Sequence, residues 1–320
     1  MDRAWVKQLI DNISVATVGE LDVPTLINDK VFHTPKQLFK IRACGDFALQ
    51  NLEAKTLFLG TADAFNDPYD TAFWADFRRI AAADKLSEME ADDEDIDRVL
   101  KSADPIASVI KLASRQVPNA LDVDGWLHEV GVLSENFQTG QLPWLIQELQ
   151  SSYKICSLSE RIDSVLMWSH YGCNHTGFAM EYDFSRDHRN DASTLCLWPV
   201  AYTSRLFDIT EILIAKRQRK DFNALYGIAA SLCKAVDWQY EREWRLVIPE
   251  GNERRGLNLV VPLKAVHLGA RISIENRASI LGICERINVP VYEVKLAPHE
   301  YKMVSEPIGR ESDTLSSSGL

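Results

Sequence analysis

Polar and apolar residues alternate from Tyr240 to Ile248, where the chain reads Tyr-Glu-Arg-Glu-Trp-Arg-Leu-Val-Ile. Because successive side chains of a strand point to opposite faces, this alternation predicts a strand with Glu241, Glu243 and Arg245 on one face and aromatic residues on the other. Neighbouring carboxylates raise the pKa of one of them, whereas a guanidinium keeps the other ionised, and an acid–base site needs this combination. A solvated strand face with a salt bridge is the alternative interpretation.

Similar patterns predict the other elements of the chain. Period-two alternation indicates strands at residues 38–42, 56–60, 154–159, 177–183, 199–202, 257–263, 266–268 and 289–296. Helical periodicity indicates helices at residues 46–54, 165–171, 208–234 and 275–287. Residues 1–35 combine a short amphipathic helix with a turn-rich connection, and we expect this segment to be peripheral.

A helical segment interrupts the region that is rich in strands. Residues 72–153 carry helical patterns, broken into short pieces by Pro105 and Pro118. We therefore predict an α+β fold in which residues 36–304 form a single domain, with a mixed, mainly antiparallel sheet as its core and a large helical insertion. Residues 305–320 are rich in Ser, Gly and Asp, and we expect them to form a disordered tail.

Composition narrows the class of protein. The chain has 320 residues, of which 46% are hydrophobic and 25% charged, as in ordinary soluble globular proteins. No apolar run approaches the ~20 residues of a membrane-spanning helix and the N-terminus lacks the pattern of a secretory signal, so we expect a cytoplasmic protein without a membrane partner. A net charge of −11 does not favour binding to nucleic acid. The six cysteines include no Cys-x-x-Cys pair, which argues against a disulfide framework and a ribbon-type zinc site.

A second group of polar residues lies just after residue 168. On a helix, His170 and Asn174 would lie four residues apart on one face, with Tyr171 and His175 as a neighbouring pair, so the segment can line a pocket. The spacing His-x-x-Cys-x-His matches no standard zinc site, and we predict no bound metal. Structural hydrogen bonding by the two histidines is the alternative.

A third group follows the strand predicted at residues 56–60. Asn66 and Asp67 precede Pro68, and such a sequence favours a tight turn that caps a following helix. As a functional loop, the same turn would place Asn66 or Asp67 beside the strand that carries Lys40 and Arg42 on one face. The chain has no Gly-x-Gly-x-x-Gly, Walker or Gly-x-Ser-x-Gly motif, so the usual evidence for a Rossmann oxidoreductase, a P-loop NTPase or an α/β-hydrolase is missing.

Taken in order, these motifs resemble the domain of unknown function 2971 family, which is widespread in bacteria. The resemblance covers roughly residues 36–295 and departs from the usual pattern at Phe39 and Ile41, where an aromatic pair is more common, and at Cys173. It rests on the segments Leu38-Phe-Lys-Ile-Arg42, Leu57-Phe-Leu-Gly-Thr-Ala-Asp-Ala-Phe-Asn-Asp-Pro-Tyr-Asp70, Cys156-Ser-Leu-Ser159, Leu166-Met-Trp-Ser-His-Tyr171, His175-Thr-Gly177 and Trp238-Gln-Tyr-Glu-Arg-Glu-Trp-Arg245.

A weaker similarity concerns chemistry. A cationic strand, a helix, a further strand and a late Glu-x-Glu strand are similar to the layout of ADP-ribosyltransferases, and this implies an ADP-ribosyltransferase-like sheet and NAD as cofactor. Glu243 would then bind the ribose 2′-hydroxyl, and Glu241 would orient the acceptor or take its proton. The other residues that the similarity or the pocket arguments assign to NAD or its surroundings are Lys40, Arg42, Asn66, Asp67, Ser169, His170, Tyr171 and Arg245.

We therefore predict an ADP-ribosyltransferase-like protein that transfers ADP-ribose from NAD to an unknown macromolecular or small-molecule acceptor. Its catalytic residues would be Glu243, Glu241 and Tyr171, because a carboxylate stabilises the cation-like centre that develops when the nicotinamide bond breaks. A non-enzymatic sensor or protein-interaction domain is one alternative. A metal-dependent nuclease that uses Asp67, Asp183 and the two glutamates is the other.

Overall fold

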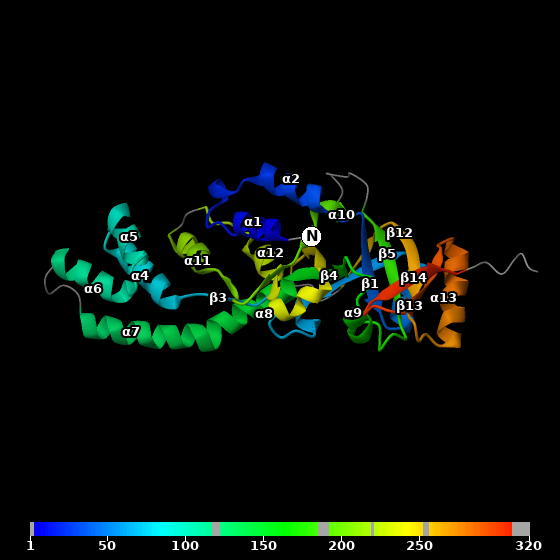
Figure 1. Cartoon of the computed structure of the whole chain (residues 1–320). Helices are drawn as coiled ribbons and strands as arrows, with labels where there is room; N and C mark the ends of the chain where they lie inside the picture. The colour runs from blue at the N-terminus through cyan, green and yellow to red at the C-terminus, as the bar shows by residue number, and fades with distance from the viewer. Residues whose placement is uncertain (1–2, 117–121, 185–191, 219–220, 252–255, 309–320) are drawn as a thin grey trace, which may run out of the picture.

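A computed structural model describes residues 3–116, 122–184, 192–218, 221–251 and 256–308 of the chain. Helices surround a curled sheet in which eight strands run in the order β11-β2-β4-β1-β5-β12-β13-β14 (Figure 1). Two further strands continue from β4, because β10 pairs with β4 and β6 pairs with β10. The strands are β1 (Gln37–Arg42), β2 (Thr56–Thr61), β4 (Tyr153–Ser159), β5 (Phe178–Asp183), β6 (Leu197–Pro199), β10 (Glu243–Pro249), β11 (Leu257–Val260), β12 (Leu263–Leu268), β13 (Val291–Leu296) and β14 (Met303–Pro307).

The pairing confirms a mixed, mainly antiparallel sheet. Only β12 and β13 run parallel within it, and every other pair of its described strands is antiparallel. Two small parallel sheets lie outside it: β3 (Phe73–Trp74) with β8 (Phe207–Asp208), and β7 (Ala201–Thr203) with β9 (Cys233–Ala235). The strand β14 corrects one prediction, since residues 305–307 belong to the sheet edge instead of a tail; residues 309–320 lie outside the described residues.

Strand β4 is a branch point of the sheet. Along one edge β10 pairs with it from end to end. The other edge is shared, because β2 pairs with Ile155 and its neighbour near the start of β4, whereas β1 pairs with Ser159 at its end. Strands β1 and β2 therefore diverge along the middle of β4, where Lys40 Nζ donates to the carbonyl of Ser157 at 2.8 Å. This divergence positions the site described below.

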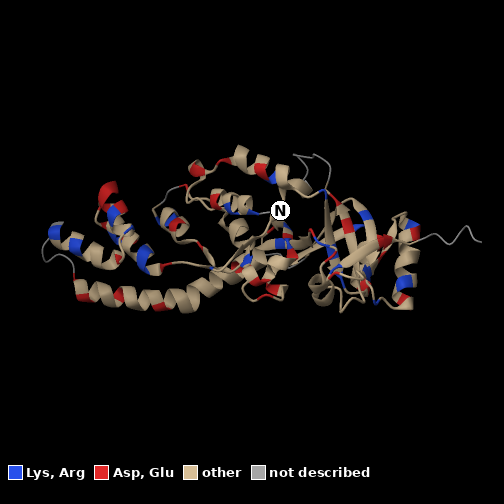
Figure 2. Ribbon diagram, viewed as in Figure 1, with Lys and Arg blue, Asp and Glu red and all other residues tan. Residues whose placement is uncertain are grey.

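The predicted helical insertion is confirmed, with the short strand β3 near its start. Helices α4 to α7 extend from the sheet at the end of the molecule opposite α13 (Figure 1). Acidic residues gather in the first turn of α5; α4 carries both signs of charge, whereas the charged side chains of α6 are only Lys and Arg and those of α7 only Asp and Glu (Figure 2). The helices are α1 (Ala4–Ile13), α2 (Val23–His33), α3 (Asp46–Glu53), α4 (Phe77–Glu88), α5 (Asp93–Leu100), α6 (Pro105–Gln116), α7 (Val123–Asn136), α8 (Leu142–Ser152), α9 (Val165–His170), α10 (Ala192–Leu195), α11 (Thr210–Arg217), α12 (Tyr226–Ser231) and α13 (Ile274–Ile287).

The N-terminal segment differs from its prediction. Its amphipathic helix exists as α1, but the apolar face of α1 is part of a large hydrophobic core that also includes residues of α4, α12 and β10. Leu9 and Ile13 are fully buried there, and Arg3 reaches the backbone of Glu243 at 3.3 Å. Helix α1 is therefore not peripheral, because the side chains that make it amphipathic fill the core.

The long helix predicted at residues 208–234 is also wrong. Helices α11 and α12 are separate, and β9 begins at Cys233; residues 219–220 lie outside the described residues. The break has a physical cause at Asn223, which is fully buried. Its side-chain amide donates to the carbonyls of Ile13 and Val15 and accepts from the backbone of Leu225, so this residue joins the chain to the end of α1.

None of the helices in the described ranges has the length and apolar composition that crossing a membrane requires.

Candidate functional site

The charged motif does not form one continuous strand. Residues Val236–Glu241 form a 3-10 helix, η4, and β10 begins only at Glu243. Between them, Arg242 adopts a left-handed conformation with φ 45° and ψ 53°, which turns the chain sharply. Glu241 therefore reaches the site from the end of η4 and Glu243 from the start of β10. The predicted proximity of the two carboxylates holds, but its cause is this turn and not the alternation of a strand.

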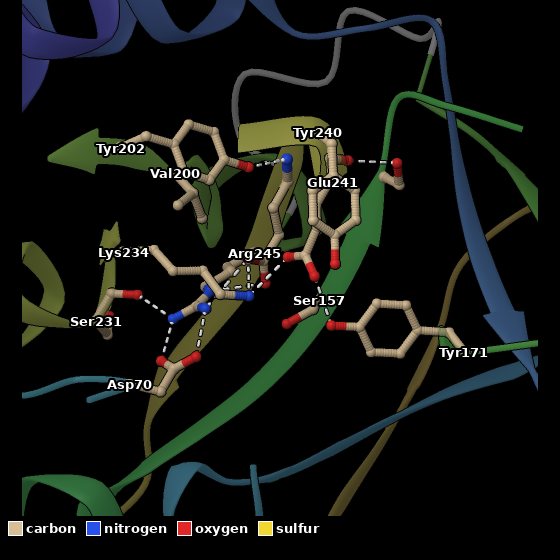
Figure 3. A network of polar contacts seen from close by, with 12 residues as sticks. Asp70, Ser157, Tyr171, Val200, Tyr202, Ser231, Lys234, Tyr240, Glu241 and Arg245 are labelled. Atoms are coloured by element: carbon tan, nitrogen blue, oxygen red, sulfur yellow. Dashed lines mark hydrogen bonds and ion pairs between the residues drawn. The ribbon is translucent and has the colours of Figure 1, made fainter. Parts of the chain in front are cut away.

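Within β10 the predicted alternation does decide which side chains face the site. Trp244 and Leu246 are fully buried in the hydrophobic core on one face of the strand. Glu243 and Arg245 share the other face, where Arg245 Nε donates to Glu243 at 2.8 Å. The same guanidinium binds both oxygens of Asp70, at 2.6 and 2.8 Å (Figure 3). Arg245 is thus a buried cation held by two carboxylates.

Lys234 in β9 bridges the two glutamates. Its Nζ lies 2.6 Å from Glu241 Oε2 and 3.2 Å from Glu243 Oε2, and all three side chains are buried. The ammonium also lies 4.7 Å from the ring centre of Trp238. Sequence reasoning assigned no role to Lys234, which lay inside the predicted long helix, and none to Asp70. A search for a cation that could neutralise the buried Glu-x-Glu pair would have pointed to Lys234, and a search for a carboxylate that could pair with Arg245 would have pointed to Asp70.

Tyr171, at the end of α9, completes the group. Its hydroxyl donates to Glu241 Oε1 at 2.5 Å, so the two oxygens of Glu241 bind a phenol on one side and an ammonium on the other (Figure 3). The backbone N–H of Glu243 donates to the hydroxyl of Tyr202 at 2.7 Å. The contacts of Asp70, Tyr171 and Tyr202 join segments that are distant in the sequence, whereas Lys234 and the two glutamates lie within nine residues of one another.

The environments of the two glutamates shift their pKa values in opposite directions. Burial and the negative charge of Glu243 raise the pKa of Glu241, and they outweigh the opposing effect of Lys234. Burial acts to raise the pKa of Glu243 as well, but the charges of Arg245 and Lys234 outweigh it and hold that pKa well below its usual range. Burial and the nearby charge of Glu241 raise the pKa of Tyr171, so its phenol stays protonated.

These side chains line a cavity of about 130 Å³ where β1 and β2 diverge from β4. Apolar side chains such as Phe39, Phe65 and Met167 form part of its wall. Five of the residues predicted from the sequence also line it: Lys40, Asn66, Tyr171, Glu241 and Glu243. Asp70 and Lys234, which were not predicted, lie in the same wall.

The other predicted residues lie elsewhere. Arg42 Nη1 donates to Asn51 at 3.2 Å, and its guanidinium lies over Phe47, so Arg42 belongs to the packing of α3. Asp67 is buried and accepts from the backbone of Tyr69 at 2.9 Å, in keeping with the turn interpretation. Arg245 is not among the described residues that line the cavity; it binds Glu243, which does line it.

Ser169 and His170 are likewise turned to local contacts. The Ser169 hydroxyl donates to the carbonyl of Val165 at 2.9 Å, and His170 Nδ1 lies 2.8 Å from the hydroxyl of Tyr240. Helix α9 ends at His170, and residues 173–175 all have positive φ, so the predicted helical pairing of His170 with Asn174 is wrong. Gly172 and Gly177 surround this tight turn, which leaves no room for a helix to continue.

Within the described ranges, no group of three or more His, Cys, Asp or Glu side chains is arranged to hold a metal ion. The carboxylates of the nuclease alternative are separate: Asp67 lies in its turn, Asp183 lies in β5, and the two glutamates bind Lys234.

Comparisons with known proteins support part of the resemblance seen in the sequence. The sequence model of a family described as Protein of unknown function (DUF2971) matches residues 167–246. This segment contains Tyr171, Lys234 and both glutamates, so the matched part of the chain supplies four polar residues of the cavity wall. No curated protein and no solved structure matches the chain, and nothing in these comparisons supports the similarity to ADP-ribosyltransferases.

Proposed function

We propose that the cavity is an active site in which Glu241 carries out acid–base chemistry. One observation carries this proposal: Lys234 bridges two carboxylates whose pKa values are shifted apart, Glu241 upward and Glu243 downward. Two carboxyl groups in different environments are a common basis for dividing acid and base roles within a site. A raised pKa allows Glu241 to accept a proton near neutral pH, whereas Glu243 stays ionised and positions the two cations.

The reaction that we propose is transfer of ADP-ribose from NAD, with Glu241 instead of Glu243 as the working carboxylate. The bond between nicotinamide and ribose C1′ breaks with both electrons leaving on nicotinamide, and the acceptor oxygen or nitrogen attacks C1′. The proton of the acceptor passes to Glu241. Tyr171 holds Glu241 in place by its hydrogen bond, and the negative charges of the site stabilise the developing positive charge at C1′.

The size of the cavity limits which part of NAD can enter it. A cavity of about 150 Å³ holds a benzene molecule, so one of about 130 Å³ accepts a single ring and not a dinucleotide. The proposal therefore places only the nicotinamide or its ribose inside, with the remainder of the cofactor outside the cavity.

The test is release of nicotinamide from NAD by the purified chain. We expect Glu241→Gln to lower the rate by about 10²–10⁴-fold, because it removes the proton acceptor. Tyr171→Phe should lower it less, because the carboxylate remains. Glu306→Gln, which changes an exposed glutamate of β14, is the matched control and should leave the rate unchanged. An equal rate in wild type and Glu241→Gln would contradict the proposal.

The non-enzymatic alternative is favoured by a specific observation, namely that Asp70, Glu243 and Arg245 are fully buried and bind one another. Such a network can serve to shape a pocket for recognition without chemistry. Calorimetry with NAD and nicotinamide separates the two functions. If the folded chain binds either ligand but does not turn NAD over, it is a sensor. If it binds neither ligand, both proposed uses of NAD are refuted.

A further inference from the structure

A second hollow of about 680 Å³ lies at the start of β1, beyond the end of β4. We call it the basic groove, and its charged walls are Arg3, Lys36, Glu160, Arg161, Asp163 and Arg242. Four cations thus face two carboxylates, which leaves two positive charges in a chain whose net charge is −11. A local excess of positive charge on an acidic protein attracts anions to one place.

One partly buried hydrogen-bond acceptor, Glu160, organises much of this charge. The carboxylate of Glu160 accepts from Arg3 at 2.8 Å, from Arg242 at 2.9 Å and from the indole N–H of Trp244 at 2.8 Å. A single carboxylate neutralises only one of the two guanidiniums that it holds. Arg3 is fixed further by the carbonyls of Val200 and Glu243, both at 3.3 Å. The groove therefore contains cations that hydrogen bonds hold in place.

Two other cations of the groove have donors to spare. Arg161 uses Nε to bind Asp163 at 2.9 Å, and its terminal nitrogens have no hydrogen-bond partner in the described part of the chain. Lys36 is exposed, and no carboxylate of the described residues lies within ion-pairing distance of its ammonium. Guanidinium and ammonium groups are the side chains that most often bind phosphate oxygens in proteins.

The groove also contains an aromatic surface. Trp5 stacks on His33 with ring centres 4.0 Å apart and planes 11° apart, and both side chains are only partly buried. Flat aromatic groups of this kind stack on nucleobases, which adds attraction beyond that of the phosphates. The volume of the groove also falls within the ~300–1,000 Å³ typical of small-molecule sites.

From these observations we infer that the basic groove binds a phosphate-bearing ligand of nucleotide size. The phosphates lie among Lys36, Arg161 and the guanidiniums on Glu160, and the base lies against Trp5 and His33. This inference does not depend on the proposed reaction, because the groove and the cavity share none of their lining residues in the described part of the chain.

The test is calorimetric titration of the full-length chain with ADP, inorganic pyrophosphate and adenosine. ADP should bind, and its affinity should fall as salt rises, since salt screens exposed charges. The double variant Lys36→Glu/Arg161→Glu should weaken binding by roughly tenfold or more, since each charge-assisted hydrogen bond contributes about that factor. These substitutions leave Glu160 and its partners intact. Lys111→Glu/Arg115→Glu, on α6, makes the same change of net charge far from the groove and should keep wild-type affinity.

If pyrophosphate binds more weakly than ADP, the ligand is a nucleotide. If pyrophosphate binds as well as ADP, the groove recognises the phosphates alone. Both outcomes support the inference. Adenosine that binds as tightly as ADP would overturn it, as would an affinity that the groove variant does not change or a folded wild type that binds neither phosphate compound. Glu241 does not line the groove, so Glu241→Gln should bind ADP as the wild type does. A failure of the proposed reaction can therefore be distinguished from a failure of ADP binding.

Discussion

At the scale of single residues, the two glutamates of the motif have different electrostatic environments. Glu243 lies among buried cations, and the energy that its charge loses on burial is offset by Arg245 and Lys234. Glu241 pairs with the cation Lys234, which it shares with Glu243, and the negative charge of Glu243 lies nearby. The ionised form of Glu241 is therefore stabilised less than that of Glu243. Spacing alone made the two carboxylates look equivalent; their partners distinguish them.

The charge of Glu243 should make the protein sensitive to acid. Its pKa is lowered on folding, so its ionised form contributes stability that is fully present above its ordinary pKa of 4.5 and is lost as the pH falls towards the folded value. Glu241 has a raised pKa and acts in the opposite sense, because its contribution decreases as the pH rises above that ordinary value. We expect the free energy of unfolding of the wild type to fall as the pH decreases below about 4.5, measured by urea unfolding.

Glu243→Gln should remove this acid-sensitive contribution and leave buried cations underpaired. At neutral pH we expect a loss of about 3–5 kcal/mol in the free energy of unfolding, as for other buried ion pairs that lose one partner. Glu306→Gln is the control, because its ion pair with Lys295 is more than half exposed and is expected to contribute about 0–1 kcal/mol. Equal stability of the two variants would show that the buried network does not hold the fold together.

At the scale of elements, tight turns bring the site residues together. Arg242 in its left-handed conformation separates η4 from β10, and the turn at residues 173–175 ends α9 so that Tyr171 points to Glu241. Gly177 allows the second turn to pack closely. A Cβ atom at Gly177 would lie 2.0 Å from the carbonyl oxygen of Arg42, and backbone atoms cannot move aside as a flexible side chain can.

Two glycine substitutions should therefore have opposite effects. Gly177→Ala should destabilise the chain by about 1–3 kcal/mol or more, because the added methyl group overlaps the backbone of β1. Gly131→Ala, inside α7, has open space around the new atom and should stabilise the chain by about 0.5–1 kcal/mol. Thermal unfolding followed by circular dichroism measures both. A Gly177→Ala variant as stable as the wild type would contradict the close approach of these segments.

At the scale of the whole molecule, the N-terminal segment and the branched sheet support the site jointly. Helix α1 packs in the core beneath β10, and Asn223 links the end of α1 to the chain that leads to α12 and β9. Lys234 therefore reaches the two glutamates from a strand whose position depends on α1. A segment expected at the periphery thus contributes to the geometry of the cavity.

Truncation of α1 inside this core should test that dependence. Leu9→Ala removes a fully buried side chain and should cost about 2–5 kcal/mol in the free energy of unfolding. Lys7→Ala, two residues away on the exposed face of α1, should change it by less than about 0.5 kcal/mol. Denaturant unfolding of the two variants gives the comparison, and similar stabilities would restore the view that residues 1–35 are peripheral.

Local patterns by themselves determined most of the elements. Alternation and capping residues correctly indicated β1, α3, β2, β4, α9, β5 and α13, and the helical character of the insertion, because the local pattern records which side chains of each segment face the core. They also placed Lys40, Asn66, Tyr171 and the two glutamates among candidate site residues, all of which line the cavity. The feature of the sequence that indicated these site residues was the occurrence of charged and aromatic residues together in short segments.

Tertiary structure alone decided the partners and therefore the chemistry. Lys234 neutralises the glutamates and Asp70 pairs with Arg245, contacts that no local pattern records, and a left-handed turn at Arg242 replaced the regular strand. Arg42 was assigned to the site because a strand would place it on the same face as Lys40, yet the divergence of β1 from β2 opens the cavity beside Lys40 while α3 binds Arg42. Burial and pairing arise only when distant segments pack together, and the pKa values of the two glutamates follow from that packing.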